Sequence, residues 1–174
     1  MTIQQPISPT LSDAHRSAVG DANRWRGYCM DKYTRAEARM REAIEVMLVH
    51  PDGTSIKRPS MFGQHVAVLA AAVAVDGVFA KPGSKVRDAL DRCGNGFQWR
   101  NIVSHAVSDV WIDRQGRWLW HYKFQPAGKD KPITSGTLTR DEASGLQRDL
   151  KSSIDRLDDH LQDFIRTLDP TVKK

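Results

Sequence analysis

The hydrophobic period of the chain changes within VWIDRQGRWLWHYKF, residues 110–124. Arg117–Phe124 has a period close to two, with an aromatic side chain at every second position, and Val110–Asp113 is a short, mostly apolar run before it, so both segments predict β-strands. Arg114-Gln115-Gly116 lies between them and is typical of a hairpin turn, in which glycine accepts backbone angles that other residues avoid. We therefore predict an antiparallel hairpin here, with Pro132–Leu138 as a third, shorter strand.

The second of these strands has two different faces, because side chains two residues apart point the same way. One face is aromatic and consists of Trp118, Trp120, Tyr122 and Phe124. The other contains Leu119 and three candidate RNA-contacting residues, namely Arg117, His121 and Lys123. We predict that the aromatic face packs against helices and that the basic face looks toward solvent. The alternative is that the aromatic rings stack on nucleic-acid bases.

Helical patterns occupy the chain before the hairpin. Apolar residues recur every three or four positions from Ser12, a candidate N-cap, to about Val49, and Gly20 is a point at which this helix can bend. Phe62–Val75 predicts a second helix that is apolar on nearly every face, and we expect it to be central to the core.

A glycine-rich segment interrupts the next helical region. Ser84 can cap a short helix that ends just before Gly94-Asn95-Gly96, which we predict to be a break. A new helix is expected from near Phe97 to about Val107. After the strands, Thr139-Arg140-Asp141-Glu142 has the spacing of a capping box and predicts a C-terminal helix.

The predicted fold class is mainly α: a helical bundle with a small antiparallel β-hairpin or three-stranded sheet inserted before the C-terminal helix. We assign residues 1–11 to a flexible leader and residues 12–169 to a single domain, with the β insertion at about 109–138. Residues 170–174 are predicted to be a tail.

Composition limits the class of protein. The 174 residues contain 26 Lys and Arg against 21 Asp and Glu, a formal charge of +5, and 40% are hydrophobic. These values exclude a largely disordered or fibrous chain, and the positive charge favours an anionic partner. Cys29 and Cys93 form no disulfide framework and fit a reducing compartment.

Targeting and metal-binding signals are missing from the sequence. No CxxC or HExxH motif occurs, and the N-terminus does not have the pattern of a signal peptide. The most apolar stretch, Val66–Val75, is about half as long as a membrane-spanning helix. We expect a cytoplasmic protein with no membrane partner, no metal site and no cofactor.

One short motif, Arg100-Asn101-Ile102-Val103-Ser104-His105, combines residue types that can act on a phosphodiester. An Arg followed directly by Asn and then, after three more residues, by His is expected roughly 0.01 times by chance in a chain of this composition. The motif resembles the RNxxxH form of the R-x(4–6)-H motif of HEPN domains. These are helical-bundle proteins found in bacterial toxins, abortive-infection systems and CRISPR-associated RNases.

The resemblance covers the motif and, in architecture, residues 12–168. It implies a metal-independent endoribonuclease, a toxin or phage-defence effector, in which Arg100 and His105 are catalytic and Asn101 supports them. RNA supplies its own 2′-hydroxyl nucleophile, a histidine can move protons near neutral pH, and a guanidinium stabilises charge on phosphate. One His cannot easily be both base and acid, so a homodimer that pairs two motifs across a two-fold cleft is expected, as in HEPN RNases.

Two other interpretations fit the same residues. The chain can be a non-catalytic HEPN-like module that binds nucleotide, nucleic acid or a protein partner. It can also be a phage or plasmid accessory protein unrelated to HEPN, with Arg100 and His105 in ordinary structural roles. The expected partners are therefore an RNA substrate, a second copy of the chain, and an antitoxin or regulatory protein.

Overall fold

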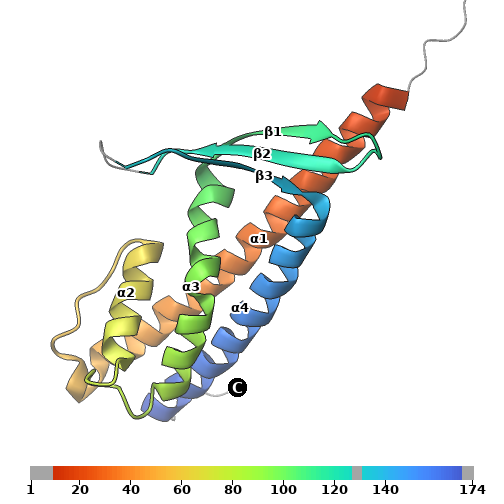
Figure 1. Cartoon of the computed structure of the whole chain (residues 1–174). Coiled ribbons are helices and arrows are strands. Elements are labelled where there is room, and N and C mark those ends of the chain that lie inside the picture. Colours follow the sequence, from red (N-terminus) through yellow and green to blue (C-terminus); the bar gives the residue numbers. More distant parts are fainter. Residues whose placement is uncertain (1–9, 127–130, 170–174) are drawn as a thin grey trace, which may run out of the picture. The chain divides into compact units, whose positions relative to one another are not determined.

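The computed structural model describes residues 10–126 and 131–169, and these are mainly helical with one three-stranded sheet before the C-terminal helix (Figure 1). The predicted fold class is confirmed at this level. The elements in chain order are α1 (Thr10–Val49), a short 3-10 turn (Pro51–Gly53), α2 (Phe62–Val73), α3 (Ser84–His105), β1 (Val107–Ile112), β2 (Trp118–Phe124), β3 (Thr134–Thr139) and α4 (Arg140–Leu168).

These elements form two compact units, each assembled from segments that are distant in the sequence. The sheet unit contains the described residues up to Met30 and Trp99–Arg148. The helical unit contains Asp31–Gln98 and the described residues from Asp149 onward. The assignment of residues 12–169 to a single domain stays a prediction.

The sheet has the strand order β1-β2-β3, and both pairs of neighbours are antiparallel. β1 begins at Val107, earlier than the predicted Val110. The turn between β1 and β2 forms as predicted. Gly116 has a φ of 77°, and the Asp113 carboxylate accepts the backbone N–H groups of Gln115 and Arg117 at 2.8 and 2.9 Å.

The aromatic face of β2 is buried against the helices of the sheet unit. Trp120 is fully buried, and its ring centroid lies 5.3 Å from that of Trp25 on α1 and 5.1 Å from that of Tyr122. The Trp25 indole N–H donates to the carbonyl oxygen of Ala143 on α4 over 2.9 Å. The packing interpretation of this face is thus confirmed, and Trp118, Trp120 and Tyr122 are too buried to stack on bases.

In the helical unit, α2 buries one face rather than all of them. Its buried side chains are Phe62, His65, Leu69, Ala72 and Val73. Ala67, Ala70 and Ala71 on the same helix are exposed, so the prediction that α2 is central to the core is wrong. The apolar composition of α2 led to this wrong prediction. An alanine methyl group has little surface, so leaving it exposed to water costs little free energy.

α3 is one continuous helix, and the predicted break at Gly94-Asn95-Gly96 is wrong. Tertiary contacts hold this segment helical. The Phe97 ring packs edge-on against Phe62 with a centroid distance of 5.2 Å, and the Tyr33 hydroxyl donates to the Gly96 carbonyl oxygen over 2.7 Å. Such contacts offset the cost of about 1 kcal/mol that a glycine adds in a helix interior relative to alanine.

Gly94→Ala is expected to raise the free energy of unfolding by about 0.5–1 kcal/mol, because alanine loses less backbone freedom in a helix. A Cβ added at Gly94 meets no atom within 4 Å, whereas one added at Gly53 would lie 1.7 Å from the Met47 carbonyl oxygen. Chemical denaturation measures both variants, and Gly53→Ala should destabilise. A Gly94→Ala protein less stable than the parent would contradict the continuous helix.

The start of α4 confirms the predicted capping box. The Thr139 hydroxyl accepts the backbone N–H of Glu142 over 3.2 Å, and the Glu142 carboxylate accepts the backbone N–H of Thr139 over 2.8 Å. The Thr139 backbone N–H and the Thr139 hydroxyl both donate to the Glu142 carboxylate, and these two bonds hold the pKa of that carboxyl below its usual range. The cap fixes the point at which the chain passes from β3 into α4.

The first helix differs from its predicted start. α1 begins at Thr10, before the predicted cap Ser12, and continues through Gly20. Residues 10–11 are therefore helical and do not belong to a leader, while residues 1–9 and 170–174, predicted as leader and tail, lie outside the described residues. Among the helices that are described, none combines the length and apolar character needed to cross a membrane.

Candidate functional site

The sheet buries one face against its own unit and leaves the other open. The open side, here called the outer face, consists of Val107, Asp109 and Trp111 from β1, Leu119, His121 and Lys123 from β2, and Ser135, Thr137 and Thr139 from β3. Trp111 is 52% exposed. A large ring left in solvent on an ordered strand marks this face as a candidate binding surface.

Trp111 and His121 form a stacked pair on this face. Their rings are parallel within 6° and their centroids lie 4.9 Å apart. His121 Nδ1 also lies 3.0 Å from the Thr137 hydroxyl oxygen on β3. The three strands together therefore fix the orientation of an indole ring that remains half exposed.

The net positive charge of the chain lies mostly in the sheet unit. Residues 1–30 and 99–148 contain 11 Lys and Arg against 7 Asp and Glu, while the rest of the chain contains 15 against 14. On the outer face, Lys123 is exposed at the position opposite Val107, and Asp109 lies opposite His121. The sheet unit is thus the part of the chain whose charge suits an anionic partner.

Arg117, the third predicted RNA-contacting residue, precedes β2 and is engaged elsewhere. Its Nε donates to the Asp113 carboxylate over 2.8 Å, and its guanidinium lies 3.5 Å from the Asp141 carboxylate. The backbone and side-chain hydrogen bonds from Arg117 lower the pKa of the Asp113 carboxyl. Arg117 therefore closes the hairpin, whereas His121 and Lys123 lie on the outer face.

The predicted catalytic residues lie on the last turns of α3. The Arg100 guanidinium donates to the Asn101 side-chain oxygen over 3.2 Å. His105 is the last residue of α3 and is exposed, and its imidazole makes no hydrogen bond or ion pair with the described residues. Five positions along a helix correspond to a rotation of about 140°, so Arg100 and His105 leave one chain in different directions. The structure brings Arg100 to Asn101 but not to His105.

Arg26 on α1 fixes the end of α3 beside β1. Its guanidinium donates to the Val103 carbonyl oxygen over 2.9 Å and to the Ser108 hydroxyl over 3.3 Å, and it lies 5.5 Å from the centre of the Trp120 ring. A cation at a helix C-terminus stabilises the unpaired carbonyl groups there. Arg26 therefore sets the position of His105 relative to the sheet without itself being available to a ligand.

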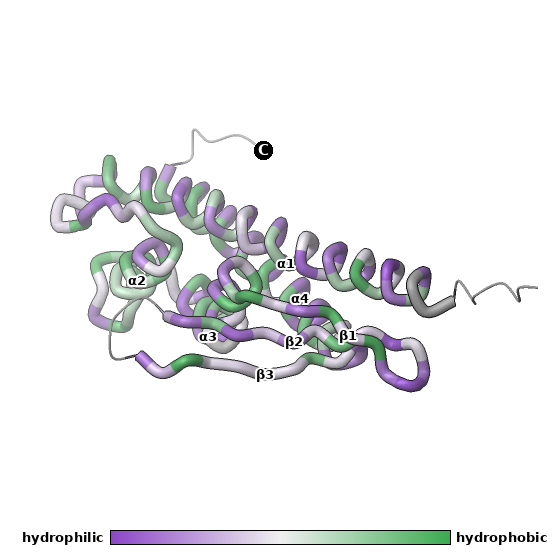
Figure 2. The backbone as a smooth tube through the Cα atoms, turned by 90° about the horizontal axis from the view of Figure 1, so that it is seen from above, coloured by the Kyte–Doolittle hydropathy of each residue, from purple (hydrophilic) through white to green (hydrophobic). Residues whose placement is uncertain are grey.

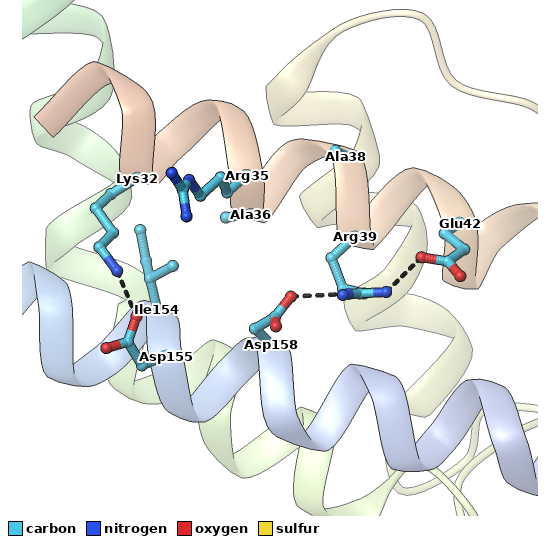
Figure 3. Close-up of a pocket in the computed structure, with 9 residues that line it drawn as sticks. All are labelled: Lys32, Arg35, Ala36, Ala38, Arg39, Glu42, Ile154, Asp155 and Asp158. Atoms are coloured by element: carbon cyan, nitrogen blue, oxygen red, sulfur yellow. Dashed lines mark hydrogen bonds and ion pairs between the residues drawn. The ribbon is translucent and has the colours of Figure 1, made fainter. Parts of the chain in front are cut away.

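A concave region of about 400 Å³ lies between α1 and α4 within the helical unit (Figure 3). Its charges are already paired: Lys32 with Asp155 at 2.5 Å and Arg39 with Asp158 at 2.8 Å. Hydrogen bonds from Lys151 and Lys32 lower the pKa of the Asp155 carboxyl. We interpret this groove as an ion-paired seam between two helices, since a ligand would have to break those pairs.

Thiol chemistry has no support at either cysteine. Both thiols are buried and free, and burial raises the pKa of Cys29 to about 12 and that of Cys93 to about 11. Neither is a thiolate at neutral pH, so neither is an activated nucleophile. Within the described ranges, no group of three His, Cys, Asp or Glu side chains is arranged to hold a metal ion.

The sequence interpretation did not single out Trp111, which is the most distinctive residue of the outer face. The available signal was its position in a strand between Val110 and Ile112, both of which point inward in the observed register.

Comparisons with protein-family models, with curated proteins and with solved structures found no match to this chain.

Proposed function

We propose that this protein binds single-stranded RNA on the outer face of its sheet. The observation that carries the proposal is the half-exposed Trp111 ring, held by a parallel stack on His121. Aromatic rings on sheets bind single strands by stacking on bases, whatever the base sequence. In a duplex the base faces are covered by their neighbours, so this chemistry selects unpaired RNA.

Charge and shape support the same assignment. Lys123 adjoins the stacked pair and can contact a phosphate, while Ser135 and Thr137 offer hydroxyl groups to the sugar and phosphate oxygens. The sheet unit carries most of the net positive charge of the chain. Because the outer face itself has few cations, stacking rather than charge should supply most of the affinity.

Fluorescence anisotropy with short labelled oligonucleotides tests the proposal. Single-stranded RNA should bind with sequence-tolerant affinity, and the same sequence in duplex form should bind more weakly. Single-stranded DNA of that sequence serves to measure the contribution of the 2′-hydroxyl. Equal affinity for single-stranded and duplex RNA would indicate a purely electrostatic surface and would contradict the stacking proposal.

Lys123→Ala is expected to weaken RNA binding at low salt and to make the salt dependence shallower, by about 0.7 in the slope of log K against log salt. The physical reason is the loss of one phosphate contact and its counterion release. Lys85→Ala, which removes an exposed cation in the helical unit, is the matched control and should leave the slope unchanged. Identical slopes for the parent and Lys123→Ala would show that Lys123 does not contact the RNA phosphates.

RNA cleavage through Arg100, Asn101 and His105 is the second candidate function. It is favoured by one observation, the exposed and unpaired imidazole of His105 two residues before Val107 of the outer face. In this reaction the RNA 2′-oxygen attacks phosphorus, the bond to the 5′-oxygen breaks, and imidazole groups take up and supply the protons. Because Arg100 points in another direction, two copies would have to supply the Arg and the His of one site.

Incubation of single-stranded RNA with the parent protein and with His105→Ala, both in EDTA, tests cleavage. Products that form with the parent and not with His105→Ala would support the reaction. RNA that is bound but remains intact would exclude this candidate and leave the binding function in place.

A further inference from the structure

β3 is an edge strand whose outward side has no partner among the described residues of the sheet unit. The strand order places it last, and Figure 2 shows it at the margin of the sheet. Its sequence, TSGTLT over Thr134–Thr139, contains no charge and no proline, and its register with β2 runs without a bulge. Edge strands usually carry charged residues, a proline or a bulge, because each of these prevents pairing with another chain.

The opposite edge of the sheet, formed by β1, is partly covered by a side chain. His15 on α1 has its Nε2 3.0 Å from the Val110 carbonyl oxygen of β1, so a side chain already occupies part of that edge. Among residues 10–126 and 131–169, the β1 edge is therefore partly covered by a side chain, and the β3 edge has no strand beside it. The asymmetry points to β3 as the edge that pairs in the working protein.

We propose that β3 pairs with β3 of a second copy, antiparallel and with Thr137 on the two-fold axis. This register opposes Ser135 to Thr139 of the other copy on the outer face, and hydroxyl-bearing pairs are favourable across strands. On the inner face it opposes Leu138 to Gly136, where the Tyr122 side chain of β2 lies against the glycine. The absence of charge on β3 means that two copies meet without like-charge repulsion.

The outer faces of the two copies then lie on the same side of one six-stranded sheet, because the two-fold axis is perpendicular to it. The two Trp111 positions lie at opposite margins, separated by five strand spacings, or about 24 Å, across the sheet and by four residues, or about 14 Å, along the strands, which together give about 28 Å. This consequence rests on the proposed RNA binding, whereas the pairing itself does not. A single strand long enough to reach both rings should bind more tightly than one that reaches only one, through effective concentration.

A charge exchange at Thr137 tests the pairing and its register. Sedimentation velocity on the full chain should show a dimer for the parent protein. Thr137→Glu and Thr137→Lys should each sediment as monomers, because like charges would face each other on the axis, and an equal mixture of the two should restore the dimer. Thr54→Glu, an exposed change in the helical unit, is the matched control and should remain dimeric.

A monomeric parent protein, or a mixture that stays monomeric, would overturn the proposal. Dimers in all variants would also overturn it, because they would place the interface elsewhere. Thermal unfolding of each variant establishes that it is folded. If the parent protein is a monomer that still binds single-stranded RNA, the pairing is excluded and the proposed function stands.

Discussion

Trp111→Ala should weaken the binding of single-stranded RNA by about 5- to 150-fold, which corresponds to the loss of one stacked base worth about 1–3 kcal/mol. The ring is half exposed and is held parallel to His121, so removing it leaves no comparable stacking surface on the outer face. The fold should change little, because much of the ring surface is already in solvent. Anisotropy titrations at one fixed salt concentration measure the effect.

Trp111→Phe is the matched control for this change. It keeps a flat aromatic ring on the same strand position and should retain most of the affinity. The pattern expected of a stacking residue is therefore tight binding for the parent and the Phe variant, and weak binding for the Ala variant. Parent-like affinity in Trp111→Ala would exclude the outer face as the RNA site.

Trp120→Ala should lower the free energy of unfolding by about 3–5 kcal/mol, the range for removing a large aromatic side chain from a core. Trp120 is fully buried, packs edge-on to Trp25 at 5.3 Å and stacks on Tyr122 at 5.1 Å. It also lies under the Arg26 guanidinium, which fixes the end of α3. Loss of the Trp120 ring should therefore weaken the packing of the sheet against α1 and against the end of α3.

Trp120→Phe separates packing from hydrogen bonding at the same position. The Trp120 indole N–H is buried and has no hydrogen-bond partner among the described residues. Phenylalanine keeps most of the ring contacts and removes this unpaired donor, so the variant should lose much less stability than Trp120→Ala. Chemical denaturation measures both variants, and equal losses would contradict the account of this core.

The kinds of elements were predictable from the sequence because each has its own period. Aromatic residues occupy every second position of β2, so the burial of Trp120 and the exposure of Lys123 followed from residue spacing alone. The cap at Thr139 and Glu142 was equally local and was confirmed. The α3 break was wrong because the contacts that hold Gly96 and Phe97 helical come from Tyr33 and Phe62, far away in the sequence.

The candidate site was only half predictable for a related reason. His121 and Lys123 belong to an alternating strand, and their shared face was read correctly. Trp111 lies between two other apolar residues, so its strand has no alternation to assign a face. Its orientation is set by pairing with Leu119 on β2, which is a property of the sheet rather than of the local sequence. The motif from Arg100 to His105 was identified from the spacing of its residues in the sequence. In the structure these residues lie on one helix, where the side chains of Arg100 and His105 point in different directions.

The most direct test of the outer face is an NMR titration that follows the tryptophan indole N–H signals. The chain has five tryptophans, of which Trp25, Trp118 and Trp120 are buried. The spectrum of Trp111→Phe identifies the Trp111 signal by its absence. On addition of single-stranded RNA, the Trp111 signal should shift while those of the three buried rings stay in place. A Trp111 signal that does not move at saturating RNA would contradict the proposed function.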